Sequence, residues 1–130
     1  MPVRVSCAVL MQGNRVLAVR RGPNMKMAGK WEFPGGKLEQ GESAEASLLR
    51  EMQEELQLEI AILQPLHPVV HAYPDIEIEL IPFLVKQIGG SLQLSEHDAF
   101  QWSSVEQLME FDWAAADLPI VKQVMEIHQD

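Results

Sequence analysis

Three glutamates within residues 36–58 have the side-chain type and spacing needed to hold a metal ion. Glu51, Glu54 and Glu55 follow a glycine-rich turn, in a stretch whose apolar residues recur at helical intervals. Because residues three and four positions apart are neighbours on a helix, these carboxylates share one stripe of its surface. Like charges packed together raise one another's pKa unless a cation lies between them. The spacing therefore predicts a site for a divalent metal ion.

The helix that carries this stripe is expected to begin near Ser43 and to divide its surface between packing and chemistry. Ser43 is a favourable N-cap, and Glu45 lies in the first turn, where the helix dipole favours negative charge. Helical spacing places the three glutamates on a different arc from the apolar side chains. The predicted apolar face consists of Leu48, Leu49, Met52 and Leu56.

The composition is typical of one small domain with an acidic surface. The 130 residues suit a single domain, residues 1–130, and the net charge of −9 arises from 19 acidic and 10 basic residues. A field of this sign does not attract nucleic-acid polymers, and a phosphate-bearing substrate would need metal ions to offset it. The one cysteine, Cys7, cannot form an internal disulfide, and no apolar run or signal-peptide pattern indicates a membrane or export. We expect a cytoplasmic protein without a membrane partner.

Strand patterns and turns along the chain predict several short elements around this helix. Gly13 and Asn14 separate two β-rich runs and fit a two-residue hairpin that places glycine first. Gly89 and Gly90 indicate a later turn. Strands are predicted at residues 3–11, 15–20, 31–33, 59–63, 68–72, 76–85 and 100–102, and a last helix at residues 118–128.

Eight residues around the first helix resemble the signature of the Nudix hydrolase family. The signature reads glycine, five residues, glutamate, seven residues, Arg-Glu, an aliphatic residue, any residue, Glu-Glu, any residue, glycine and an aliphatic residue. Gln57 stands where the family usually has glycine, the residue that lets the helix end in a left-handed turn. The resemblance implies an α+β Nudix fold, an α/β/α sandwich with a mixed β-sheet. The matching residues are Gly36, Glu42, Arg50, Glu51, Met52, Glu54, Glu55 and Leu58.

Similarity to the MutT-type branch of this family, which cleanses oxidised nucleotides, extends over nearly the whole chain. Residues 31–37 resemble the segment before the signature, and residues 73–75 resemble a later aromatic-Pro-Asp turn. Glu96 stands like an extra metal-binding glutamate of that branch. Residues 116–119 resemble the segment that reads the base. Asp117, where MutT proper has asparagine, is closer to the bacterial relatives that cleave cytidine triphosphate.

The resemblance implies a Mg²⁺-dependent enzyme, with Mn²⁺ as an alternative ion, that hydrolyses a nucleoside triphosphate to the monophosphate and pyrophosphate. Mg²⁺ prefers oxygen ligands and bridges carboxylates to phosphate oxygens, where it can neutralise charge and acidify a bound water. By this resemblance Glu54 and Glu55 bind the metal. The carbonyl of Gly36 adds a ligand, and Glu96 reaches in from a loop. Glu51 binds the metal, orients the attacking water or takes its proton.

Five further residues are candidates for supporting or substrate-binding roles. Arg50 is expected to hold a carboxylate in a bidentate pair, and Glu42 to brace the turn before the helix. Arg21 resembles a phosphate-contacting arginine of MutT, unless it is a solvated loop charge. Asp117 could read the base, cap the last helix, or do both. Tyr73 could stack on the base.

Other aromatic residues and the histidines are weaker candidates for the site. Trp31 and Phe83 could also stack on a base, although aromatic residues near strands mostly fill the core. The four histidines, His97 among them, lack the short spacing of metal ligands. They are expected on the surface or packed against other residues.

The residues leave several substrate classes and one non-enzymatic role open. The first choice is 8-oxo-dGTP, and the alternative is CTP, dCTP or a 5-substituted cytidine triphosphate. Other Nudix substrates, such as ADP-ribose or capped RNA, are also open, because fold and signature do not fix the substrate. A catalytically silent Nudix module that binds nucleotides or a partner would have the same fold. The intact carboxylates argue against silence. We expect a monomer or a homodimer, since no apolar seam distinguishes the two.

Overall fold

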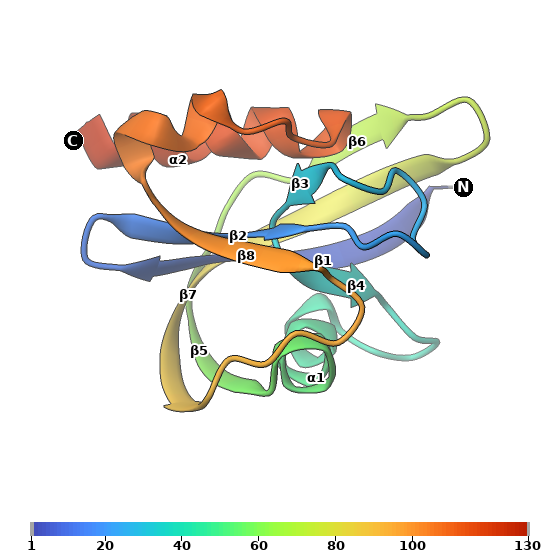
Figure 1. The fold of residues 1–130 in the computed structure, drawn as a ribbon. Helices are drawn as coiled ribbons and strands as arrows, with labels where there is room; N and C mark the ends of the chain where they lie inside the picture. Colours follow the sequence, from blue (N-terminus) through green and yellow to red (C-terminus); the bar gives the residue numbers. More distant parts are fainter. Residues whose placement is uncertain (1, 130) are drawn as a thin grey trace.

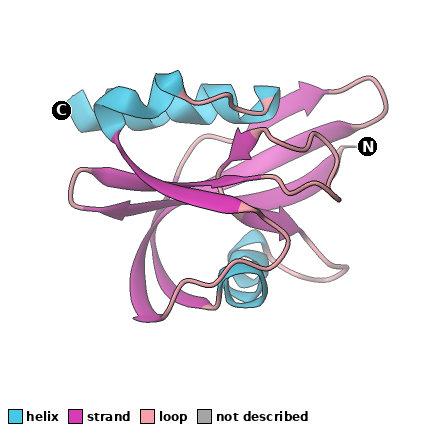
Figure 2. Ribbon diagram, viewed as in Figure 1, coloured by secondary structure: helices cyan, strands magenta, loops and turns pink. Residues whose placement is uncertain are grey.

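A mixed β-sheet with one helix on each face makes up the computed structural model, which describes residues 2–129 (Figure 1). Helix α1 (Ala44–Leu56) covers one face and helix α2 (Leu118–Gln129) covers the other, so the sheet lies between helices (Figure 2). This arrangement confirms the predicted α+β class and the α/β/α sandwich with a mixed β-sheet. No helix within residues 2–129 is both long and apolar enough to cross a membrane.

Within the described part of the chain, eight strands build the sheet and two short 3₁₀ helices follow it. They are β1 (Val3–Gln12), β2 (Arg15–Arg20), β3 (Trp31–Glu32), β4 (Gly35–Lys37), β5 (Leu58–Pro65), β6 (Val69–Ala72), β7 (Glu77–Gly90), β8 (Ala99–Ser104), η1 (Val105–Glu110) and η2 (Ala115–Asp117). The strand order is β3-β2-β1-β7-β5, with β4 on β1, β6 on β7 and β8 on β2. The central strand β1 runs parallel to β7 and antiparallel to β2 and β4, so the sheet is mixed.

The hydrophobic core lies on both faces of the sheet because the side chains of β1 alternate between them. Cys7 and Val9 pack on the face covered by α2, whereas Ala8 and Leu10 pack on the face covered by α1. All four residues are buried, which explains why residues 7–11 of this strand form an unbroken apolar run rather than an alternating one. The central strand is therefore held from both faces.

The predicted hairpin between β1 and β2 is confirmed. Gln12 and Arg15 pair across the two intervening residues. Gly13 has a φ of +59°, and Asn14 does not have a positive φ. A positive φ at the first central residue is what a two-residue turn of type II′ requires, and glycine adopts it without steric cost.

Helix α1 begins where the sequence predicts but buries a different set of side chains. The hydroxyl of Ser43 accepts a hydrogen bond from the Ala46 N–H at 3.1 Å, which confirms the predicted N-cap. The prediction that Leu49 packs in the core is wrong, because Leu49 is 45% exposed. Ser47 is buried instead, and its hydroxyl lies 3.2 Å from that of Ser6 on β1. A buried polar pair therefore forms part of the contact between helix and sheet.

The prediction of a turn at Gly89 and Gly90 is wrong, because both residues lie at the end of β7. Gly89 pairs with Glu59 and Gly90 pairs with Leu58 on β5. Gly90 has a φ of +85°, and a Cβ atom there would collide with the backbone of Gln57. Glycine is needed at this position for a close approach of two backbones, and the chain does not reverse there.

Helix α1 ends at Gln57 in the left-handed conformation for which glycine is the usual residue. Gln57 has φ +57° and ψ +37°, and its N–H donates to the carbonyls of Gln53 and Met52. A side chain in this conformation brings Cβ close to a carbonyl oxygen, at a cost of about 1 kcal/mol. The helix therefore exits in the geometry of a glycine cap although the glycine is absent.

Replacing Gln57 with glycine is expected to raise the free energy of unfolding by about 0.5–1 kcal/mol, because glycine adopts a positive φ without steric cost. The greater freedom of glycine in the unfolded chain limits the gain. Urea unfolding followed by circular dichroism measures the change. Gln53→Gly, inside the helix, is the matched control and should lose about 1 kcal/mol. An equal loss at both positions would contradict the left-handed exit.

Candidate active site

A cavity of about 510 Å³ brings together residues that lie far apart in the sequence. Its wall includes parts of β1, the loop after β2, β4, α1, the turn after β6, the loop before β8 and η2. The predicted site residues that line it are Arg21, Gly36, Glu51, Glu55, Tyr73, Glu96 and Asp117. The other three, Glu42, Arg50 and Glu54, lie outside this lining.

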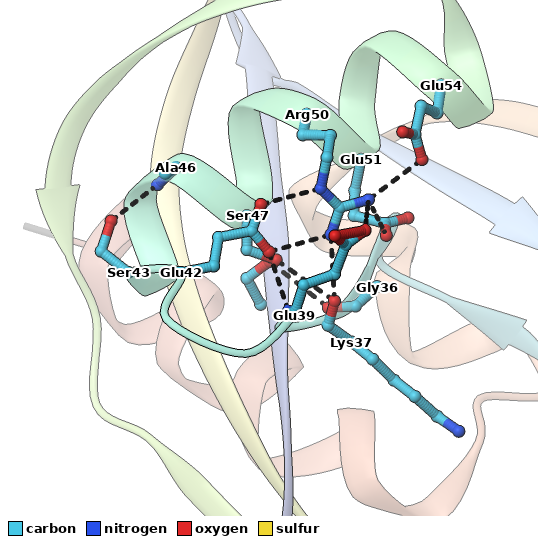
Figure 3. Close-up of polar contacts among 11 residues, drawn as sticks. Gly36, Lys37, Glu39, Glu42, Ser43, Ala46, Ser47, Arg50, Glu51 and Glu54 are labelled. Atoms are coloured by element: carbon cyan, nitrogen blue, oxygen red, sulfur yellow. Dashed lines mark hydrogen bonds and ion pairs between the residues drawn. The ribbon is translucent and has the colours of Figure 1, made fainter.

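Arg50 on α1 is the centre of an ion-pair network beside the cavity (Figure 3). Its Nε and Nη2 atoms donate to the two carboxylate oxygens of Glu42 at 2.8 and 2.9 Å, which makes a bidentate pair. Its Nη1 atom donates to Glu51 at 2.8 Å and to Glu54 at 3.0 Å. Nη2 also donates to the carbonyl of Lys37 at 3.2 Å. One guanidinium therefore ties α1 to the chain that leaves β4.

Glu42 braces the turn before α1. One of its oxygens accepts a hydrogen bond from the backbone N–H of Glu39 at 2.9 Å, in addition to the pair with Arg50. The hydrogen bond from Arg50 and then that from Glu39 lower the pKa of Glu42 to about 2. The turn is therefore held by a carboxylate that stays ionised at neutral pH.

Glu51 and Glu55 line the cavity as partly buried carboxylates. Burial raises the pKa of Glu51, and the nearby carboxylates of Glu55 and Glu54 raise it further. Arg50 offsets this rise only in part. Burial also raises the pKa of Glu55, and the carboxylate of Glu96 adds to the effect. Each carboxylate thus disfavours ionisation of the others, and a bound cation would relieve that repulsion.

Two local features fit a divalent cation at this position. The Oε2 atom of Glu55 is buried without a hydrogen-bond partner, which is costly unless an ion or water satisfies it. A Cβ atom at Gly36 would collide with the carboxylate of Glu51, so glycine lets this carboxylate lie against the turn. Among residues 2–129, no three His, Cys, Asp or Glu side chains already form a complete ligand set.

Asp117 contributes a buried carboxyl group to another part of the cavity wall. It is 5% exposed, and its Oδ1 atom accepts a hydrogen bond from the Phe33 N–H at 3.0 Å. Burial raises the pKa of Asp117, and the charge of Glu32 adds to the effect. In the described part of the chain this carboxyl makes no hydrogen bond to the first turn of α2. The side chain therefore faces the cavity and does not cap the helix.

Tyr73 and Arg21 line the cavity with polar groups that are already partly engaged. The hydroxyl of Tyr73 accepts a hydrogen bond from the Ala116 N–H at 3.0 Å, which fixes the orientation of the ring. Arg21 pairs through Nη1 with Glu32 at 2.8 Å and donates through Nε to the carbonyl of Lys26. Its Nη2 atom has no hydrogen-bond partner within residues 2–129 and is available to an anionic ligand.

Glu32 and His97 also line the cavity, and the sequence predicts a site role for neither. Glu32 binds Arg21 with one oxygen and contacts the Nε2 atom of His97 with the other, each at 2.8 Å. His97 is 6% exposed, so it is a packed histidine rather than a surface one. Their positions, directly before a Phe-Pro-Gly-Gly bend and directly after Glu96, are the signals that could have indicated them.

The aromatic candidates other than Tyr73 lie outside the cavity lining. Trp31 packs against Phe111, with ring centroids 5.0 Å apart. Phe83 is 4% exposed in the core on the α1 face of the sheet. Phe83 therefore fills space in the core, whereas the half-buried Trp31 packs against the core, as aromatic residues near strands usually do.

Comparisons with known proteins extend the likeness from the signature to the whole fold. The NUDIX domain model matches residues 1–124. The CTP pyrophosphohydrolase of Escherichia coli is 32% identical over 123 residues, which are 95% of this chain and 91% of that protein. The 8-oxo-dGTP diphosphatase of Escherichia coli is 31% identical over 113 residues, 87% of this chain and 88% of that protein. The solution structure of the E. coli ORF135 protein superposes with a TM-score of 0.87 at 31% identity, covering 97% of this chain and 90% of that one.

Glu42→Gln is expected to lower stability at neutral pH, and the loss should fade in acid. The pKa of Glu42 is about 2 in the folded chain against a usual value of 4.5. Its ionised form therefore stabilises the fold above about pH 4.5, and this contribution is lost as the pH falls towards 2. Urea unfolding across this pH range measures the difference from wild type. The exposed Glu126→Gln is the matched control, and a Glu42→Gln deficit that persists undiminished to about pH 2 would contradict the role.

Glu55→Gln is expected to stabilise the metal-free protein near neutral pH. Because the pKa of Glu55 is raised, its ionised form weakens the folded state, and the gain should shrink as falling pH protonates the wild-type carboxyl. Mg²⁺ should reverse the order, since an ion at 100 times its Kd stabilises the wild type by about 2.7 kcal/mol. Thermal unfolding in EDTA and in Mg²⁺ measures both effects. If Glu55→Gln is less stable than wild type in EDTA, the ionised carboxylate of Glu55 does not destabilise the fold.

Proposed function

The chain belongs to the Nudix hydrolase family, and we propose that it is a nucleoside triphosphate pyrophosphohydrolase that requires a divalent metal ion. Its products would be the nucleoside monophosphate and pyrophosphate. The observation that carries this proposal is one cavity that holds Glu51, Glu55 and Glu96 together with the buried carboxyl of Asp117. Such a cavity offers ligands for a phosphate-bound ion and a polar group that can read a base.

The residues around Gly36 would hold the metal ion and activate the attacking water. A bound Mg²⁺, or Mn²⁺ in its place, would neutralise charge on the phosphates and lower the pKa of a coordinated water. Glu54 and Glu55 would be its carboxylate ligands. The carbonyl of Gly36 and the carboxylate of Glu96 would add to them. Glu51, whose carboxylate lies against Gly36, would bind the ion, orient the water or accept its proton.

Arg21 and Tyr73 would supply contacts to the nucleotide. The free Nη2 atom of Arg21 would contact a phosphate, and the fixed ring of Tyr73 would stack on the base. The net charge of −9 opposes binding to nucleic-acid polymers, so the substrate would be a free nucleotide. We propose that the protein acts in the cytoplasm, since the free, buried Cys7 is compatible with a reducing compartment. We also propose that it acts as a monomer or homodimer.

We propose 8-oxo-dGTP as the first candidate substrate. An ionised Asp117 would accept two hydrogen bonds, which matches the N–H groups on the Watson–Crick edge of guanine and 8-oxoguanine. The likeness to an 8-oxo-dGTP diphosphatase over 87% of this chain supports this choice. Cleavage of such a nucleotide would remove oxidised bases from the pool used for DNA synthesis.

Cytidine triphosphates are the second candidate, and they would suit Asp117 in its neutral form. Burial and the charge of Glu32 raise the pKa of Asp117, which favours the neutral acid. A neutral carboxyl group offers one donor and one acceptor, and cytosine presents a matching N3 acceptor and N4 amine. The CTP pyrophosphohydrolase that resembles 95% of this chain supports the same class.

Asp117→Asn is expected to separate these candidates. Asparagine keeps an oxygen for the Phe33 N–H and offers one donor and one acceptor, as the neutral acid does, but it cannot accept both N–H groups of guanine. We expect kcat/KM for 8-oxo-dGTP to fall about tenfold more than for CTP. Pyrophosphate release from a panel of normal and oxidised triphosphates, in Mg²⁺ and in EDTA, measures both values.

The same panel tests the proposed function as a whole. Preference of the wild type for 8-oxo-dGTP over dGTP, with loss of activity in EDTA, would support the first candidate. Preference for cytidine nucleotides would support the second. Equal losses for every nucleotide in Asp117→Asn would exclude base reading by this residue. Nucleotide binding without phosphate release in several divalent metals would refute catalysis and leave the silent binding module.

A further inference from the structure

We propose that His97 and Gly22 are positioning residues that hold the Glu96 carboxylate at the rim of the cavity. This inference rests on the proposed function, because it takes Glu96 to be a ligand of the divalent ion. It adds to the site two residues that lie outside the Nudix signature, one on the loop before β8 and one on the loop after β2.

Glu96 lies between β7 and β8 in a segment without helix or strand. It is exposed, yet it lines the cavity and lies near enough to Glu55 to disfavour the ionisation of that residue. Among the contacts of residues 2–129, no hydrogen bond or ion pair holds the Glu96 carboxylate. An exposed loop glutamate samples many positions unless its backbone is fixed. The position of Glu96 must therefore come from its neighbours.

The next residue, His97, is anchored inside the protein. Its side chain is 3% exposed, and its Nε2 atom lies 2.8 Å from an oxygen of Glu32. The other oxygen of Glu32 lies 2.8 Å from Nη1 of Arg21. Since Glu32 belongs to β3 and Arg21 directly follows β2, this chain of contacts ties the loop to the sheet. The Nδ1 atom of His97 has no partner in the described chain, so the anchor is the pair with Glu32.

The backbone on both sides of His97 is also fixed. A Cβ atom at Gly22 would collide with the carbonyl oxygen of Glu96, so this close approach requires glycine. The Asp98 N–H donates to the carbonyl of Arg20 at 3.1 Å, and the side chains of the same two residues form an ion pair at 2.7 Å. Residues 96–98 therefore lie fixed against the end of β2.

These anchors fix the backbone from which the Glu96 side chain reaches the cavity that it lines. A histidine that merely filled space would affect stability when removed and leave the affinity for a metal ion unchanged. Partners that orient a metal ligand behave differently, since their loss lowers metal affinity or activity by about 10–100-fold. Metal affinity is thus the property that distinguishes positioning from packing.

Mn²⁺ binding to the metal-free protein, measured by water-proton relaxation, tests the proposal without a substrate. His97→Ala is expected to weaken Mn²⁺ binding about tenfold, whereas His97→Gln, whose amide can still donate to Glu32, should recover most of the affinity. Hydrogen exchange at the Asp98 amide should accelerate in His97→Ala. The exposed His67→Gln is the matched control and should bind Mn²⁺ as the wild type does.

Gly22→Ala tests the same role through the contact between Gly22 and the Glu96 backbone. It replaces His97→Ala as the test if that variant does not fold. The new Cβ atom would push against the Glu96 backbone, so Mn²⁺ binding should again weaken about tenfold. Gly89→Ala is its matched control. There the atoms nearest to the Cβ atom belong to the flexible side chain of Glu59, and Mn²⁺ affinity should not change.

Effects that act through Glu96 should disappear when Glu96 is replaced. In a Glu96→Gln background, neither His97→Ala nor Gly22→Ala should weaken Mn²⁺ binding further. Unchanged affinity in both single variants, or losses that simply add in the double variants, would overturn the proposal. A wild-type protein that binds Mn²⁺ but releases no pyrophosphate would refute the proposed function, and the same titrations would still decide the positioning role. A wild-type protein that binds no Mn²⁺ would overturn both.

Discussion

The burial of several carboxylates close together is the constraint on which the rest of this structure depends. Glu51 and Glu55 line the cavity, and burial disfavours the ionisation of both. Arg50 compensates from outside the cavity, where it holds Glu51 and Glu54 through one nitrogen and Glu42 through two. This guanidinium offsets the charge of the carboxylates that lie close together on the stripe in the folded chain. The unpartnered oxygen of Glu55 lies on the inner side of the stripe, where we propose that a divalent ion binds.

The fold supports this stripe by joining distant segments to one central strand. Strand β1 is packed on both faces and pairs with β4, which places Gly36 opposite Ser6. The hydroxyl of Ser6 donates to that of Ser47 on α1, so the turn and the helix have a common support. The loop before β8 is held against the end of β2 through Asp98. The proposed ligands therefore come from three elements that the same sheet aligns, with Glu96 on the third.

The sequence predicts the parts of the site that local spacing determines. The carboxylate stripe follows from helical periodicity, and the Ser43 cap follows from the preference for serine at a helix start. The resemblance to a family supplies the sandwich around them. The roles of Glu32 and His97 could not be predicted, because they depend on a contact between residues 65 positions apart. The errors at Leu49 and Gly89 have the same origin. Whether a helical residue is buried, and whether a glycine turns or pairs, depends on neighbours from elsewhere in the chain.

The presence of a metal ion between α1 and the loop before β8 is tested most directly by Mn²⁺-induced broadening of backbone amide NMR signals in the metal-free protein. A paramagnetic ion broadens the signals nearest to it. We expect the amides of Gly36, Glu55 and Glu96 to broaden first, while those of α2 stay sharp. Broadening that begins at another acidic surface, such as Glu77 and Glu79 on β7, would contradict a metal site formed by the carboxylate stripe.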